Sequence, residues 1–101
     1  MNDLRAPIEV RHSAAASRFE ATVDGFVCFA AYDRQDDVLR MNHTSVPAKV
    51  EGRGIAATIV RFALDYARAN KLLVEPWCSY VRAYMKRHPE THTLLPKGFR
   101  L

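Results

Sequence analysis

Two side chains in this sequence, Cys78 and His43, have the chemistry of a nucleophile and of a base. Cys78 immediately precedes residues 79–87, whose pattern predicts a helix. A thiol at a helix N-terminus forms its thiolate more readily, because the helix dipole stabilises the negative charge. An imidazole could then serve as the base for that nucleophile, or it could take the proton from an attacking amine directly.

Both residues also have a purely structural interpretation. Free cysteines are among the most buried residues in proteins, so Cys78 could be part of the core. His43 follows Leu39 and Met41 at alternate positions of a predicted strand, and alternate residues share one face of a strand. His43 could therefore be packed on that face with a satisfied hydrogen bond. The other cysteine, Cys28, lies within a hairpin strand and is predicted to be structural.

Two glycines, Gly52 and Gly54, lie at the start of a predicted long helix. Glycine costs about 1 kcal/mol in a helix relative to alanine, so the pair needs a reason. The free N–H groups at a helix N-terminus form an anion site, and glycine lets a bulky diphosphate approach them closely. The alternative is a plain, flexible helix entry. A turn from strand to helix inside a crossover unit favours the anion site, because ligands usually bind there.

The first half of the chain predicts an antiparallel meander of four strands. Residues 18–23 alternate polar and apolar side chains with the period of a strand. Asp24-Gly25 follows, and this pair between two strand-like runs is a strong signal of a hairpin turn. A polar run over 33–37 predicts a second turn. The predicted strands are residues 7–12, 18–23, 26–32 and 38–45.

The second half predicts two helices with a strand between them. Apolar residues recur at helical spacing from about 53 to 70. The apolar run 72–74, which Pro76 stops, predicts a strand buried on both faces. Residues 79–87 predict the second helix, and the last dozen residues predict a loop and tail.

The resulting order is ββββ-α-β-α, an α+β fold with helices packed on one sheet. The strand at 38–45, the long helix and the strand at 72–74 form a crossover unit, which makes these two strands parallel neighbours in a mostly antiparallel sheet. His43 and Cys78 both lie toward the same end of these strands. We therefore expect the two side chains along the same gap.

Length and composition predict one domain over residues 1–101. Hydrophobic residues make up 49% of the 101 residues, enough for one core and too little for two. The longest apolar run, 26–32, is far shorter than the roughly 20 residues that cross a bilayer, and the N-terminus has no secretory pattern. We therefore expect a cytoplasmic protein with free thiols and no membrane partner. Two cysteines are too few for a zinc site, so no metal is predicted.

The segment Lys49-Val50-Glu51-Gly52-Arg53-Gly54 resembles the [Gln/Arg]-x-x-Gly-x-[Gly/Ala] signature of the GNAT superfamily of N-acetyltransferases, and the predicted element order matches that fold. Together with 43–47 and 76–81, residues 52–56 resemble a minimal, single-domain branch that carries a cysteine after the fifth strand. The resemblance covers about residues 10 to 95. One departure is Lys49, which stands where glutamine or arginine is usual and lacks their planar side-chain group.

The resemblance implies that acetyl-coenzyme A is bound, with its pyrophosphate held by backbone N–H groups of the signature and its pantetheine arm in a gap between the two parallel strands. The implied cofactor-binding residues are Val46, Lys49, Glu51, Gly52, Arg53, Gly54, Ile55 and Ala56. It also makes Cys78 the candidate active-site residue. Tyr84, which shares a helix face with Tyr80, becomes a candidate acid for the departing thiol. With His43, which its place near the end of a strand suggested, the candidate catalytic residues are Cys78, His43 and Tyr84.

Three functions follow from these observations. The first is transfer of an acetyl group from acetyl-coenzyme A to an amine, such as a protein lysine or N-terminus, by direct attack or through a Cys78 thioester. The second is binding or sensing of acyl-coenzyme A without catalysis. The third is nucleic-acid binding, which the net charge of +4 allows but the scattered basic residues disfavour. The oligomeric state and the acceptor are not encoded in any motif.

Overall fold

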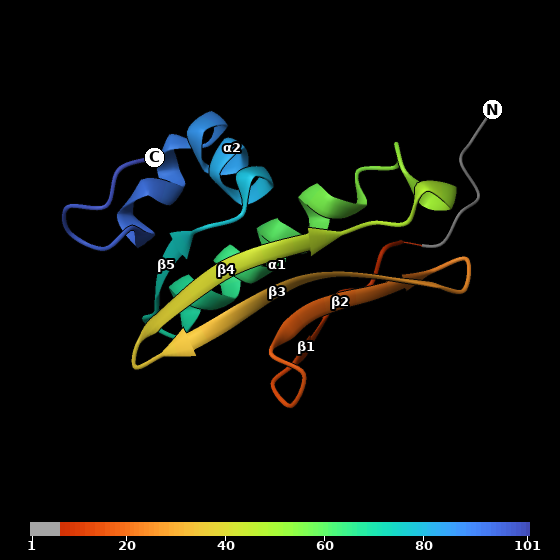
Figure 1. Ribbon diagram of the computed structural model, residues 1–101, viewed down its shortest axis with the longest axis horizontal. Coiled ribbons are helices and arrows are strands. Elements are labelled where there is room, and N and C mark those ends of the chain that lie inside the picture. Colours follow the sequence, from red (N-terminus) through yellow and green to blue (C-terminus); the bar gives the residue numbers. More distant parts are fainter. Residues whose placement is uncertain (1–6) are drawn as a thin grey trace.

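The computed structural model describes residues 7–101 and has one five-stranded sheet in the order β1-β2-β3-β4-β5 (Figure 1). The strands are β1 (Arg11–Ser13), β2 (Arg18–Val23), β3 (Phe26–Gln35), β4 (Val38–Ser45) and β5 (Leu73–Pro76). The helices are α1 (Ile55–Ala69) and α2 (Ser79–Arg87), with 3₁₀ turns η1 (Ala48–Val50) and η2 (Pro89–Leu94). Neighbouring strands are antiparallel except β4 and β5, which are parallel. The predicted ββββ-α-β-α fold is confirmed.

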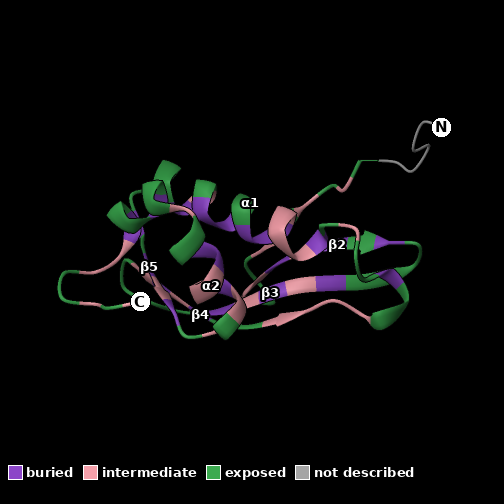
Figure 2. Cartoon of the chain, turned by 90° about the horizontal axis from the view of Figure 1, so that it is seen from above, coloured by how far each residue is buried: buried purple, intermediate pink, exposed green. Residues whose placement is uncertain are grey.

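The core lies between the sheet and α1, which runs behind the strands in Figure 1. The helix buries one stripe at the spacing expected from its sequence: Ile55, Ile59, Val60, Ala63, Leu64 and Ala67. Figure 2 shows the exposed segments of α1 on the side away from the strands. Burying a large aliphatic side chain contributes about 1.5–3 kcal/mol, so this stripe fixes the helix on the sheet. None of the helices over residues 7–101 is long and apolar enough to cross a membrane.

The first strand is shorter than predicted and begins later. The alternation over 7–12 predicted a strand there, but the ladder covers only Arg11–Ser13, paired with the start of β2. Ile8 and Val10 still pack against the core, although they lie outside any strand. The apolar alternation therefore reflects side-chain burial and not pairing. In contrast, β3 extends to Gln35, beyond the predicted end at 32, because its last residues pair with the start of β4.

A β-bulge interrupts β4. Its pairing with β3 passes from Ala31 opposite His43 to Tyr32 opposite Met41, which leaves Asn42 as an extra residue. An extra residue reverses the alternation of side chains beyond it. Met41 is fully buried, whereas His43 is exposed. The expectation that His43 shares a face with Leu39 and Met41 is therefore wrong.

The fifth strand is an edge strand, which the sequence did not predict. Leu72 and Val74 are buried, but Leu73 between them is 37% exposed, so the strand is not covered on both faces. Pro76 does not stop the strand before it; it is the last strand residue, opposite Met41, a position that proline tolerates.

The helix ends and the C-terminal segment also differ in detail from what the sequence predicts. Helix α1 spans Ile55–Ala69 within the predicted 53–70. The segment predicted as loop and tail includes η2, whose Thr91 and Leu94 are each 5% exposed. This 3₁₀ turn contacts both α1 and α2, so it closes the end of the core.

Candidate functional site

Strands β4 and β5 diverge where the site forms. Their ladder ends at Met41 and Pro76. Beyond it, the carbonyl oxygen of Met41 accepts the N–H groups of Trp77 and Cys78 at 2.9 and 2.8 Å. The chain then turns into α2 at Ser79, while β4 continues without β5 to Ser45. A gap therefore opens between the end of β4 and the start of α2.

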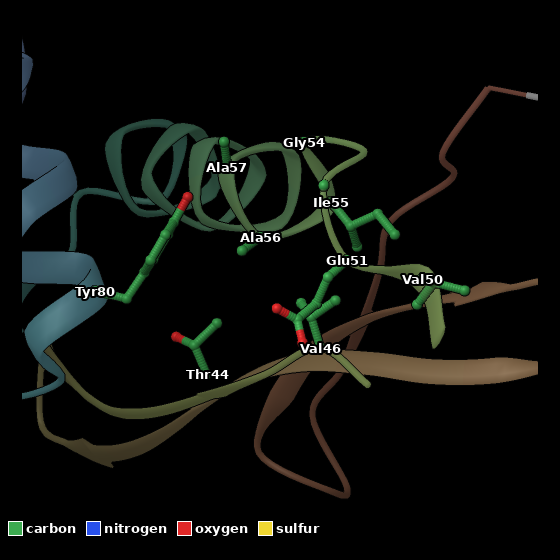
Figure 3. A pocket seen from close by; sticks show the side chains of 10 residues that line it. Thr44, Val46, Val50, Glu51, Gly54, Ile55, Ala56, Ala57 and Tyr80 are labelled. Carbon is green, nitrogen blue, oxygen red and sulfur yellow. The ribbon is translucent and has the colours of Figure 1, made fainter. Parts of the chain in front are cut away.

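A pocket of about 420 Å³ occupies this gap, and we call it the glycine pocket (Figure 3). The end of β4 lies along one side, the first turn of α1 along another, and Tyr80 of α2 faces that turn. Its lining residues are Thr44, Val46, Val50, Glu51, Gly52, Gly54, Ile55, Ala56, Ala57 and Tyr80.

Both glycines of the signature have backbone conformations that favour glycine. Gly54 is the N-cap of α1 with φ of 71°, and Gly52 has φ of 81°. A left-handed conformation costs other residues roughly 1–2 kcal/mol. Apart from the two chain neighbours of each glycine, a Cβ atom at either position would have no described atom of the protein within 4 Å. The space next to both glycines is therefore not filled by side chains from elsewhere in the described chain, and both glycines line the pocket.

The start of α1 has backbone N–H groups that lack a hydrogen-bond acceptor within the helix. The first helical bond runs from the N–H of Thr58 to the carbonyl of Gly54, at 3.0 Å. The N–H groups of Ile55, Ala56 and Ala57 precede that bond and have no acceptor within the helix. No side chain among the described residues caps them, and the first turn has no acidic residue. This end of the helix is therefore suited to an anion.

The only carboxylate lining the glycine pocket, within the described chain, belongs to Glu51. Figure 3 shows its side chain extending toward Val46 and away from Gly54. Its negative charge therefore lies on the β4 side of the pocket and not at the helix start.

Cys78 lies beside the glycine pocket, with its Sγ 3.4 Å from Oγ1 of Thr44. Burial raises the pKa of Cys78, but the hydrogen bond with Thr44 and the backbone N–H groups of Tyr80 and Val81 outweigh it, so the pKa lies below the ordinary thiol value. Neither N–H group makes a full capping hydrogen bond to the sulfur. The thiol is therefore predisposed to ionise next to a pocket wall.

His43 is not brought to Cys78. It faces the side of the sheet opposite α1, and its ring centroid is 5.8 Å from that of Phe29. The bulge at Asn42 turns His43 outward and turns Thr44 inward, so Thr44 is the partner of the thiol. Nothing in the sequence marks this bulge, so the sequence does not indicate Thr44 as a site residue.

Tyr84 is also absent from the glycine pocket and lines a second pocket between α1, α2 and η2. Tyr80, one helical turn earlier, lines the glycine pocket instead. The sequence correctly placed both on one face of the helix, but it could not show which turn lies beside the end of β4.

Some of the other implied cofactor-binding residues line the pocket, and others lie outside it. Val46, Glu51, Ile55 and Ala56 line the pocket. Lys49 is exposed in η1 and does not line it. Arg53 is outside as well, because its Nη1 pairs with Oδ2 of Asp24 at 2.6 Å. The basic side chains of the signature, Lys49 and Arg53, therefore do not line the pocket, whereas Gly52 and Gly54 do.

Comparisons with known proteins agree with this architecture. A family model described as GCN5-related N-acetyl-transferase matches residues 18–94. The chain is 29% identical over 91 residues to Protein NATD1 of Gallus gallus and of Homo sapiens; the match covers 82% of this chain and 78% and 76% of those proteins. A Staphylococcus aureus protein described as GCN5-like, solved by NMR, has the same fold with a TM-score of 0.69 and 16% identity over 88% of each chain. The chain therefore belongs to the GCN5-related N-acetyltransferase family.

Proposed function

We propose that this protein transfers an acetyl group from acetyl-coenzyme A to an amine, and that the glycine pocket is its active site. The observation that supports this most strongly is the pocket itself. It runs from a helix start suited to an anion to Thr44 near the end of β4, whose Oγ1 lies 3.4 Å from the thiol of Cys78.

The residues present fit the diphosphate of coenzyme A. The free N–H groups of Ile55, Ala56 and Ala57 would donate to its oxygens, at about 1.5–3 kcal/mol for each hydrogen bond to a charged group. The open space beside Gly52 and Gly54 leaves room for the diphosphate to approach. The backbone supplies these contacts, so the loss of a planar side chain at position 49 does not remove them.

The pantetheine arm would lie in the gap between the end of β4 and α2. Thr44 and Val46 line this gap from the strand, and Tyr80 lines it from the helix. This direction would bring the thioester toward Thr44 and hence toward Cys78. When bound, acetyl-coenzyme A supplies an electrophilic carbonyl carbon and a thiolate leaving group.

Two routes of transfer remain open in this pocket. In the covalent route, the Cys78 thiolate attacks the carbonyl carbon, the thioester C–S bond breaks, and the coenzyme leaves as a thiolate that takes a proton from Tyr80. The amine then attacks acetyl-Cys78, loses a proton to solvent or to Glu51, and releases the Cys78 thiolate. A proton from solvent or Glu51 restores the Tyr80 phenol. In the direct route, the amine attacks the coenzyme thioester itself, the C–S bond breaks, and the amine loses a proton to solvent or to Glu51 while the leaving thiolate takes one from Tyr80. Cys78 then only supports Thr44 of the pocket wall. In both routes Tyr80 takes the acid role that the family resemblance implied for Tyr84.

His43 has no proton transfer with Cys78 in this proposal, because it lies on the opposite face of the sheet. The pocket is partly open to solvent, which suits an amine on the surface of another molecule, such as a protein lysine or N-terminus.

The test is to measure release of coenzyme A thiol from acetyl-coenzyme A with a panel of amines, in parallel with calorimetric binding. We expect binding together with amine-dependent release. Cys78→Ala should retain binding and lose any acetyl adduct detected by mass spectrometry. If that variant transfers acetyl groups at the parent rate, the covalent route is wrong and the direct route remains. Binding without release for any amine would favour an acyl-coenzyme A binder.

A further inference from the structure

The second pocket, between α1, α2 and η2, is separate from the proposed active site. It has a volume of about 310 Å³, and apart from Leu64 its lining residues are polar. The charged and hydrogen-bonding groups that matter here are Arg61, Asp65, Arg68, Tyr84, His88 and Glu90. No residue lines both pockets, so the second pocket needs its own explanation.

Tyr84 contributes an unused hydroxyl to this pocket. The residue is only 7% exposed, and its hydroxyl has no hydrogen-bond partner within residues 7–101. Burial raises the pKa of Tyr84; Arg61 lowers it, and Asp65 and Glu90 raise it further. These three charged residues line the same pocket as the phenol. No fully buried polar side-chain atom among the described residues lacks a partner, so this unpartnered hydroxyl is reached by solvent. Because Tyr84 lines the pocket, the hydroxyl is available to a ligand there.

His88 adds an aromatic wall and an acceptor. Its ring stacks on Tyr84 with centroids 4.0 Å apart and an interplanar angle of 16°. Its Nδ1 lies 2.7 Å from the carbonyl oxygen of Tyr84, and a carbonyl can only accept, so Nδ1 carries the hydrogen. In the neutral ring Nε2 then remains an acceptor.

The charges of the pocket are balanced. Arg61 makes no ion pair with any other residue in 7–101, and Asp65 pairs only loosely with Arg68, at 3.7 Å. Glu90 adds a second carboxylate, while its carbonyl oxygen accepts from Arg68 at 3.1 Å. A phosphate would be repelled by the two carboxylates, and a simple cation by the two guanidinium groups. A ligand that carries both charges complements the pocket.

We propose that the second pocket binds a small zwitterion of the α-amino acid class. Arg61 would bind the carboxylate, and Asp65 and Glu90 would bind the ammonium group. The Tyr84–His88 stack would contact the aliphatic part. The volume is at the lower limit of ordinary small-molecule sites, and a ligand of this size would bind with a Kd of about a millimolar. This proposal does not depend on the assignment of the glycine pocket.

The experiment is an NMR titration of the full chain with L-alanine, N-acetyl-L-alanine and L-alaninamide. The two analogues each lack one charge of the zwitterion. We expect L-alanine to shift amide signals of residues 61–68 and 84–91, and we expect each analogue to bind roughly tenfold more weakly, the loss of one charge-assisted hydrogen bond. Equal binding of an analogue, or no shift with L-alanine, would overturn the proposal.

Matched variants locate the site. Arg61→Gln and Asp65→Asn each remove one charge from an exposed position of α1, so both should fold, which their own spectra will show. Each should weaken L-alanine binding roughly tenfold, whereas Arg87→Gln, exposed on α2 outside the pocket, should not. Adenosine 3′,5′-bisphosphate is the competing ligand. If it binds here with the same dependence on Arg61 and L-alanine does not, the pocket receives a nucleotide, and the zwitterion proposal is wrong.

Discussion

Replacing Gly54 by alanine tests the proposed diphosphate site, and Gly98→Ala is its matched control. Both glycines have positive φ, 71° and 86°, and a Cβ at either would have no described atom within 4 Å apart from those of its two chain neighbours. The two substitutions therefore impose similar backbone strain. Only Gly54 borders the glycine pocket, so only Gly54→Ala should place a methyl group where the diphosphate would approach.

The expected magnitudes separate stability from binding. The left-handed conformation costs alanine roughly 1–2 kcal/mol, partly offset by about 0.4–1 kcal/mol from the less flexible unfolded chain. The net loss of about 1 kcal/mol should lower Tm by about 4–8 °C in each variant. Gly54→Ala should in addition lose at least one charged hydrogen bond, about 1.5–3 kcal/mol, which raises the Kd for coenzyme A about 10- to 150-fold.

Thermal denaturation and calorimetry with coenzyme A measure the two effects separately. The reasoning is refuted if Gly54→Ala binds coenzyme A as tightly as the parent while its Tm falls as expected. It is also refuted if Gly98→Ala loses as much affinity as Gly54→Ala, because the effect would then come from strain and not from the pocket.

Three further predictions concern single side chains. Thr44→Val should raise the pKa of Cys78, because it removes a hydrogen bond that favours the thiolate; the pH profile of iodoacetamide alkylation should move to higher pH, and an unchanged profile would contradict this. Tyr80→Phe should lower kcat for acetyl transfer by roughly 100-fold with little change in coenzyme A affinity, whereas Tyr84→Phe should leave kcat unchanged. Burial lowers the pKa of His12 below 6.5, so the folded state favours the neutral ring; its contribution to stability should be complete above pH 6.5 and should decrease as the pH falls through the lowered pKa. Urea denaturation at several pH values measures this, and a His12→Phe variant that keeps the same acid dependence would assign it to other groups.

Much of the fold could be predicted because its signals are local. The helical spacing in α1 and the Asp24-Gly25 hairpin each depend on residues close together in the sequence, and the structure has both elements at the predicted places. The beginning of β1 and the edge position of β5 depend instead on which partner each strand meets. Ile8 and Leu73 show the consequence: both are apolar, yet the first lies outside any strand and the second faces outward.

The contrast between local signals and strand pairing also applies to the candidate site. The positions of Gly52 and Gly54 at the helix start follow from local backbone preferences, and the structure places them there. The partner of Cys78 follows from the bulge at Asn42, which exists only because β3 and β4 pair with one extra residue. A one-residue shift exchanges the faces of all later side chains in the strand, so this single residue determines that Thr44, and not His43, contacts the thiol. Alternation along the sequence therefore cannot assign side chains to a site beyond such a point, although it correctly locates the strand that carries them.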